Sequence, residues 1–82
     1  MESKYLDFIK EIVPNRKTPL VHVMNKSTTY LGTICFYPAW RKFVFNPESD
    51  IVFDTSCLSD IIAEINELQH EWKESLKNEL KR

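Results

Sequence analysis

The side chains best suited to catalysis are few: two cysteines, Cys35 and Cys57, and two histidines, His22 and His70. Cys57 stands where a long helical pattern begins, and the positive end of a helix can lower a thiol pKa enough to make a nucleophile. Neither histidine has a sequence spacing that relates it to Cys57 as a general base. We therefore favour a small, buried, unreactive thiol at Cys57, and we expect no enzymatic activity.

Metal and phosphate sites find equally little support. Zinc binding by the four side chains above would draw one ligand from each of four separate elements, without the short paired spacings of structural zinc sites. Three acidic residues, Glu48, Asp50 and Asp54, lie close together but lack the glycine and the final glutamate of a calcium loop. The single glycine, Gly32, lies inside a predicted strand, so no glycine-rich phosphate loop is present. The sequence thus predicts no catalytic residue, no metal and no cofactor.

The strongest candidate for a binding surface is a predicted hairpin tip, where Tyr37, Trp40, Arg41 and Lys42 bring two rings beside two cations. Trp, Tyr and Arg are enriched in protein-binding hot spots, which favours a protein partner. Rings beside cations also describe a single-stranded nucleic-acid platform. The net charge of −1 places that alternative second, because such binding depends on positive charge. A purely structural interpretation carries at least as much weight: Trp40 covers the edge of the core, Arg41 stacks on it or pairs with an acidic residue of the helix, and the tip has no partner.

The length and composition indicate one soluble domain, residues 1–82, because two cores could not each bury enough apolar surface in 82 residues. Apolar residues make up 43% of the chain and charged residues 28%, which is typical of a globular protein. The first residues lack the pattern of a signal peptide, and no apolar run approaches the length of a membrane span. We therefore expect a cytoplasmic protein with free thiols and no membrane contact.

The N-terminal part, residues 1–19, is expected to hold a helix and a connector. Apolar residues recur at three- and four-residue intervals from Tyr5 to Val13, which predicts a helix over residues 3–13. Pro14 ends this pattern and opens a polar connector that runs to Pro19. The residues that follow, 20–24, form a short and mostly apolar run, which predicts a strand covered on both faces.

The sheet is expected to occupy residues 20–53. With a four-residue loop over 38–41, Phe36 lies opposite Phe43 and Ile34 opposite Phe45, so these four residues share one face of an antiparallel hairpin. Alternate residues then form a second, mixed face. A short edge strand is predicted at residues 51–53. Because the first face is strongly apolar and the second is mixed, we expect a helix to cover only the first. The second face consists of Thr33, Cys35, Lys42, Val44 and Asn46.

A long helix is expected within residues 55–82, with capping oxygens from residues 54–56. Residues 57–80 would span about 36 Å, whereas a globule of this size is roughly 30 Å across, so the last turns should overhang. Either this end lies in solvent, or Leu76 and Leu80 pack against a second copy in a homodimer. The expected fold is α+β: an N-terminal helix, a three- to four-stranded antiparallel meander sheet, and a long C-terminal helix on one face. The helical stripe consists of Leu58, Ile61, Ile62, Ile65, Leu68, Trp72, Leu76 and Leu80.

The hairpin and the start of the last helix also carry a recognisable motif. It reads Gly-x-Ile-x-Phe-Tyr-Pro-x-Trp-Arg-x-Phe-x-Phe-x-Pro from Gly32 to Pro47, and then Cys-Leu-x-Asp-Ile from Cys57 to Ile61. This pattern resembles a family of short uncharacterised proteins encoded by bacteriophages and integrated mobile elements, over about residues 30–70. Members usually carry tryptophan at the position of Phe36 and tyrosine at that of Phe43. The resemblance implies a phage or mobile-element origin, and hence the cytoplasm of a bacterial host cell, but no activity.

Overall fold

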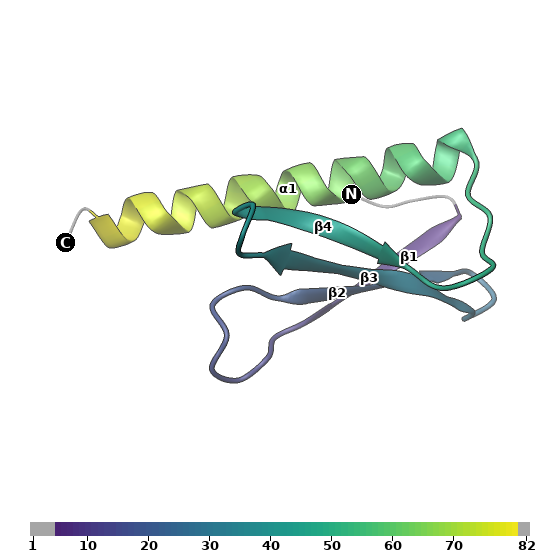
Figure 1. Ribbon diagram of the computed structural model, residues 1–82, viewed down its shortest axis with the longest axis horizontal. Helices are drawn as coiled ribbons and strands as arrows, with labels where there is room; N and C mark the ends of the chain where they lie inside the picture. Colours follow the sequence, from purple (N-terminus) through teal and green to yellow (C-terminus); the bar gives the residue numbers. More distant parts are fainter. Residues whose placement is uncertain (1–4, 81–82) are drawn as a thin grey trace.

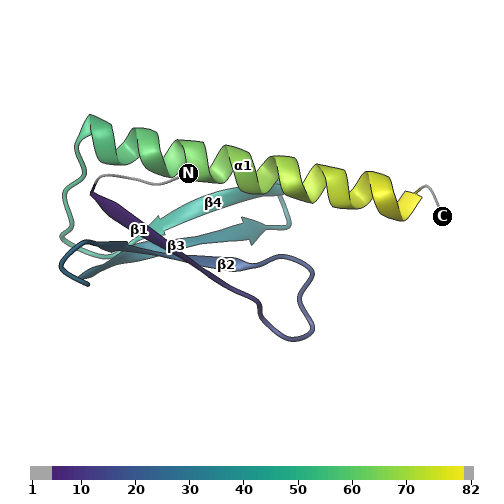
Figure 2. The same ribbon diagram turned by 180° about the vertical axis from the view of Figure 1, so that it is seen from behind.

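A computed structural model describes residues 5–80, and of residues 79 and 80 only the backbone. Four strands precede a single helix: β1 (Leu6–Glu11), β2 (Leu20–Asn25), β3 (Tyr30–Tyr37), β4 (Lys42–Pro47) and α1 (Thr55–Leu80). Each strand pairs antiparallel with the next, so the sheet is a meander in the order β1-β2-β3-β4. The helix α1 lies along one face of this sheet, and no helix of the described residues covers the other (Figures 1 and 2). The predicted α+β class is confirmed.

The central hairpin has the predicted register. Phe36 pairs with Phe43 and Ile34 with Phe45 across β3 and β4. Ile34 is fully buried and Phe43 is 5% exposed, while Phe36 and Phe45 pack against this core from partly buried positions. The Phe36 ring also meets Trp72 of α1, with ring centroids 4.9 Å apart. The apolar face of the hairpin is therefore the face that the helix covers.

The predicted N-terminal helix is wrong, because the described part of this segment, from Leu6 to Glu11, is the edge strand β1. Leu6 is 2% exposed and faces the helix, whereas Ile9 is 50% exposed on the open face. Lys10 also lies on the helix side, where its Nζ is 3.2 Å from Glu71 Oε1. A strand at this position pairs its backbone with β2, whereas an isolated helix of this length would be marginal.

The predicted edge strand at residues 51–53 is also absent. The fourth strand of the sheet is β1 instead, and residues 51–53 carry the chain from β4 up to the helix layer (Figure 1). Ile51 and Phe53 still pack against the core, and Val52 is 93% exposed. Pro47, at the end of β4, has no N–H group to continue a ladder. The alternation of buried and exposed residues at 51–53 therefore arises because Ile51 and Phe53 pack against the core, and this segment pairs with no strand.

Gly32 is required by the close approach of two strands. A Cβ atom at this position would lie 2.5 Å from the carbonyl oxygen of Asn46 and 2.8 Å from the Phe45 ring. The pairing of β2 with β3 also shifts register beside it, between Val23 and Met24. The ring of Phe45 thus occupies the space that a side chain at position 32 would take.

The helix is capped at its start and projects at its end. Asp54 Oδ1 accepts a hydrogen bond from the Cys57 N–H at 2.9 Å, so the predicted capping role of Asp54 is confirmed. The 26 residues of α1 span about 39 Å at 1.5 Å per residue, in a molecule that measures 44 × 22 × 21 Å. Its C-terminal turns extend past the sheet in both views (Figures 1 and 2). The core-facing stripe is narrower than expected, because Leu58 and Ile62 are exposed.

Candidate binding surface at the overhanging end of the helix

Two loops and the end of α1 meet at one end of the molecule. Glu11 pairs with Leu20 and Tyr37 with Lys42, so the β1–β2 loop and the hairpin tip each close at these pairs. The pairing of Val21 with Ile34 places both loops at the same end of the sheet, beneath the projecting turns of α1 (Figure 1). We call this region, which comprises residues 12–19, 37–42 and 66–78, the overhang end.

The hairpin tip presents two aromatic rings to solvent. Tyr37 and Trp40 pack edge to face, with centroids 4.8 Å apart and ring planes at 69°. They remain 44% and 66% exposed. The N–H groups of Trp40 and Arg41 donate to the carbonyl oxygens of Tyr37 and Pro38, both at 3.2 Å, and these bonds close the turn. The described structure thus places Trp40 on Tyr37, with most of its surface in water.

Gln69 of α1 anchors the tip to the helix. Its Oε1 accepts a hydrogen bond from the Phe43 N–H at 3.0 Å, and its Nε2 donates to the Arg41 carbonyl at 3.3 Å. The Arg41 guanidinium lies 5.8 Å from the centroid of the Trp72 ring. One side-chain amide therefore occupies the outer edge of β4 as a neighbouring strand would. Sequence reasoning missed Gln69, because a glutamine beside His70 and Glu71 is typical of an exposed helix face.

Two hollows lie beneath the overhanging turns, one on each side of Trp72 and Leu76. The first, of about 250 Å³, separates α1 from the β1–β2 loop. The second, of about 550 Å³, separates α1 from the hairpin tip. Phe43 also lines both. We call them the loop groove and the tip groove. The loop groove is bordered by Lys10, Ile12, Lys17, Pro19 and Glu71, and the tip groove by Arg41, Lys42, Ile65, Asn66, Gln69 and Lys73.

The tip groove is lined by cations without acidic partners. Three basic side chains border it, Arg41, Lys42 and Lys73, and no carboxylate does. In the described part of the chain none of the three takes part in an ion pair. Lys17 of the loop groove is equally unpaired, whereas Glu71 there is held by Lys10. The tip groove therefore offers positive charge that no carboxylate in its lining neutralises.

The opposite end of the molecule is acidic. It holds the β2–β3 turn, the segment after β4 and the start of α1, which share a third hollow of about 380 Å³. Lys26 lies there too, but its Nζ is 2.6 Å from Asp7 Oδ1. The cations of the tip groove and the acidic residues of this end thus lie at opposite ends of the described structure. The acidic residues of this end are Glu48, Asp50, Asp54 and Asp60.

Three of the side chains first considered for catalysis, Cys35, Cys57 and His22, lie outside the overhang end, and the fourth, His70, is exposed on α1 beside Gln69. Burial raises the pKa of the Cys57 thiol, and the neighbouring Asp54 carboxylate raises it further, which disfavours the nucleophilic thiolate. Cys35 Sγ accepts a hydrogen bond from Asn46 Nδ2 at 3.2 Å. Among the described residues, no three His, Cys, Asp or Glu side chains gather to hold a metal ion.

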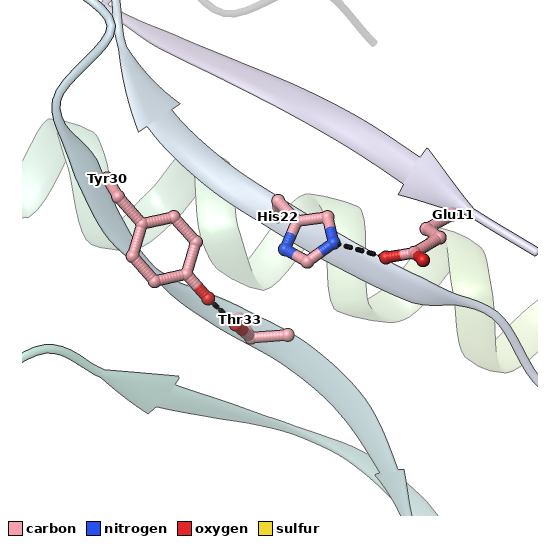
Figure 3. A network of polar contacts seen from close by, with 4 residues as sticks. All are labelled: Glu11, His22, Tyr30 and Thr33. Carbon is pink, nitrogen blue, oxygen red and sulfur yellow. Dashed lines mark hydrogen bonds and ion pairs between the residues drawn. The ribbon is translucent and has the colours of Figure 1, made fainter. Parts of the chain in front are cut away.

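His22 belongs to a polar network on the open face of the sheet (Figure 3). Its Nε2 lies 2.7 Å from Glu11 Oε1, and its ring packs at 6.0 Å from the ring of Tyr30. The Tyr30 hydroxyl is in turn hydrogen-bonded to the Thr33 hydroxyl. The contacts of His22 with Glu11 and Tyr30 join neighbouring strands, and the bond between Tyr30 and Thr33 lies within β3, so the network is accounted for by packing on one face of the sheet.

The predicted dimer contact is only partly within the described side chains. Leu76 is partly buried and lines both grooves, and the side chain of Leu80 lies outside the described residues. The homodimer and the solvated end therefore stay two alternative predictions for these turns. No helix in the described part of the chain has the length and apolar character needed to span a membrane.

Comparison with known proteins finds one clear relative. The chain is 37% identical over 73 residues to an uncharacterised 9.3 kDa protein of Acholeplasma phage L2, and the match covers 88% of this chain and 94% of that protein. No protein-family model and no solved structure matches the chain. A phage relationship, predicted from the hairpin motif, is confirmed at this level, while the residue pattern of the motif is not tested.

Proposed function

This chain belongs to the family of small phage proteins that includes the 9.3 kDa protein of Acholeplasma phage L2, and we propose that it is a non-enzymatic binding module whose contact surface is the hairpin tip. The observation that carries the proposal is the edge-to-face pair of Tyr37 and Trp40, exposed at the end of a well-anchored hairpin. Aromatic rings of this kind dominate contact energetics when a partner covers them.

The anchoring of the tip supports this role. Two turn hydrogen bonds and the two bonds to Gln69 hold the tip in one conformation before any partner arrives. A preorganised surface binds more tightly, because less conformational entropy is lost when the complex forms. The positions of Arg41 and Lys42 beside the rings add charge to the same surface.

The proposal is tested by crosslinking in the infected host cell. The tagged full-length chain would be compared with a variant that carries Tyr37→Ala and Trp40→Ala, both at exposed positions where folding is little affected. A control variant carries Val52→Ala and Ile62→Ala, which remove two exposed apolar side chains outside the tip. We expect wild type and control to capture the same partner and the tip variant to lose it. Equal capture by the tip variant would contradict the proposal.

A further inference from the structure

The segregation of charge changes which partner the tip fits best. From the sequence alone we favour a protein partner over nucleic acid, because a net charge of −1 offers no long-range attraction for phosphates. Among the described residues, however, the cations without an ion pair lie at one end of the molecule and the acidic residues of the helix start lie at the other. Local fields, and not the total charge, determine where a polyanion is captured. The overhang end can therefore attract phosphates although the whole molecule is slightly acidic.

The tip groove has the shape and the lining for an extended polyanion. It is an open hollow of about 550 Å³ with Arg41 and Lys42 on one wall and Lys73 on the other. Asn66 of α1 also lines the groove. Three cations that face one groove without carboxylates repel one another, and a chain of phosphates would relieve this repulsion. Arginine and lysine are also the side chains that bind phosphate most often.

The aromatic rings lie where bases would follow the phosphates. Tyr37 and Trp40 stand at the exposed end of the hairpin, next to Arg41 and Lys42. Base stacking on such rings is tolerant of sequence and needs unpaired bases. The Trp72 ring is less available, because Arg41 lies over it and Phe36 packs against it. Stacking is thus confined to the tip, and Trp40 is the tryptophan that would report it.

A protein partner fits the same surface less well. Hot-spot rings of protein interfaces lie near the centre of a desolvated patch that is enclosed by other contacts. Here the two rings are exposed next to Arg41 and Lys42, outside the lining of the tip groove, and the apolar side chains of that lining, Phe43 and Trp72, are already packed against the core. Exposed rings that adjoin a cationic groove are typical of a surface that binds single-stranded nucleic acid.

We propose that the overhang end binds single-stranded nucleic acid, with phosphates on Arg41, Lys42 and Lys73 and bases stacked on Tyr37 and Trp40. This inference rests on the proposed function, because it names the partner of the same tip. Double-stranded DNA is excluded from the stacking step, since its bases are paired and stacked on each other.

The test is a titration of a fluorescent oligothymidylate of about 15 nucleotides with the full chain at several salt concentrations. Three phosphate contacts predict that log K falls with log salt with a slope of about −2. Binding should also quench tryptophan fluorescence, and Trp40→Ala should abolish most of the quenching. A duplex of the same length should bind at least about tenfold more weakly.

Two variants with the same change in net charge separate the groove from the rest of the surface. Lys42→Gln with Lys73→Gln removes two positive charges from the tip groove, and Lys26→Glu makes the same change at the acidic end. We expect the first to weaken oligothymidylate binding about tenfold or more and to reduce the salt slope to less than half. The second should change the affinity less than about twofold. Thermal melting of both variants checks that each is folded.

Three outcomes would overturn the inference: no salt-sensitive binding of the oligothymidylate, equal binding of the duplex, or equal loss of affinity in the Lys26→Glu control. A polyglutamate peptide serves as the rival ligand. Suppose that the polyglutamate peptide binds the wild type and loses affinity in the variant with Lys42→Gln and Lys73→Gln, while the oligothymidylate does not bind. The partner is then an acidic protein. In these cases the proposed function would still stand, provided that the Tyr37 and Trp40 variant loses its crosslinked partner in the host cell.

Discussion

At the scale of single residues, Gln69 has the clearest structural role. It gives one hydrogen bond to the Arg41 carbonyl and receives one from the Phe43 N–H, and so it blocks the free edge of β4. An open strand edge invites pairing with other chains, and a covering side chain prevents it. The same two bonds fix the orientation of the tip relative to α1.

We therefore predict that Gln69→Ala lowers the free energy of unfolding by about 1–2 kcal/mol, because two hydrogen bonds are lost and a backbone N–H loses its partner. The adjacent and exposed His70→Ala should change it by less than about 0.5 kcal/mol. Urea denaturation of both variants measures the difference. Equal free energies of unfolding in the two variants would show that the two hydrogen bonds of Gln69 contribute nothing to stability.

Asp54 links stability to pH through its capping bond. The hydrogen bond from the Cys57 N–H holds the pKa of this carboxyl below its usual value, so the unfolded chain binds a proton more readily than the folded one. The stabilisation is complete above the unfolded pKa of about 3.9 and is lost as the pH falls through the lower folded pKa.

We predict that Asp54→Asn flattens the acid limb of the stability curve, because an amide caps the helix without titrating. Thermal midpoints between about pH 5 and pH 2 should fall less steeply in the variant than in the wild type. Parallel curves would mean that other carboxyls account for the whole acid dependence.

At the scale of elements, the hairpin could be predicted and the first element could not. The alternation of apolar residues around Pro38, together with a short loop, determines the pairing of Phe36 with Phe43 from neighbouring residues alone. Between Tyr5 and Val13 the apolar residues fit a helix nearly as well as a strand. The segment becomes a strand because its backbone pairs with β2, which lies outside the segment in the sequence.

A pair of substitutions separates the strand from the helix at this position. The helical pattern places Ile9 in the core and leaves out Leu6, whereas in β1 Leu6 is 2% and Ile9 is 50% exposed. We predict that Leu6→Ala costs about 2–5 kcal/mol and Ile9→Ala less than about 1 kcal/mol in urea denaturation. If Leu6→Ala does not fold, the milder Leu6→Val should still cost more than Ile9→Val. A larger loss of stability at Ile9 than at Leu6 would contradict the strand and support the helix predicted from the sequence.

At the scale of the whole molecule, the tip itself was found from residue types, but the rest of the surface was not. Tyr37, Trp40, Arg41 and Lys42 are close in sequence and stand out by composition. Lys17 and Lys73 join them only because the strand pairing brings the β1–β2 loop, the tip and the end of α1 together. Their contribution depends on the register of the sheet and on the length of the helix, which composition does not contain.

The overhang also bears on oligomeric state. The Leu76 side chain lies on the sheet-facing side of α1, where it is partly buried and lines both grooves. It is therefore only partly available to a second copy of the chain. We predict that sedimentation at several concentrations gives the mass of a 9.7 kDa monomer throughout. A mass that rises with concentration, and returns to the monomer value in Leu76→Glu, would instead support the dimer predicted through Leu76 and Leu80.

The most direct test of the overhang end as the functional surface is an amide NMR titration of the labelled full chain with an oligothymidylate. The predicted shifts fall in residues 37–43 and 66–76, which line the tip and its groove, and leave residues 48–58 of the acidic end and the network of Figure 3 unchanged. Shifts centred on the acidic end or on the open sheet face, or no shifts at all, would contradict it.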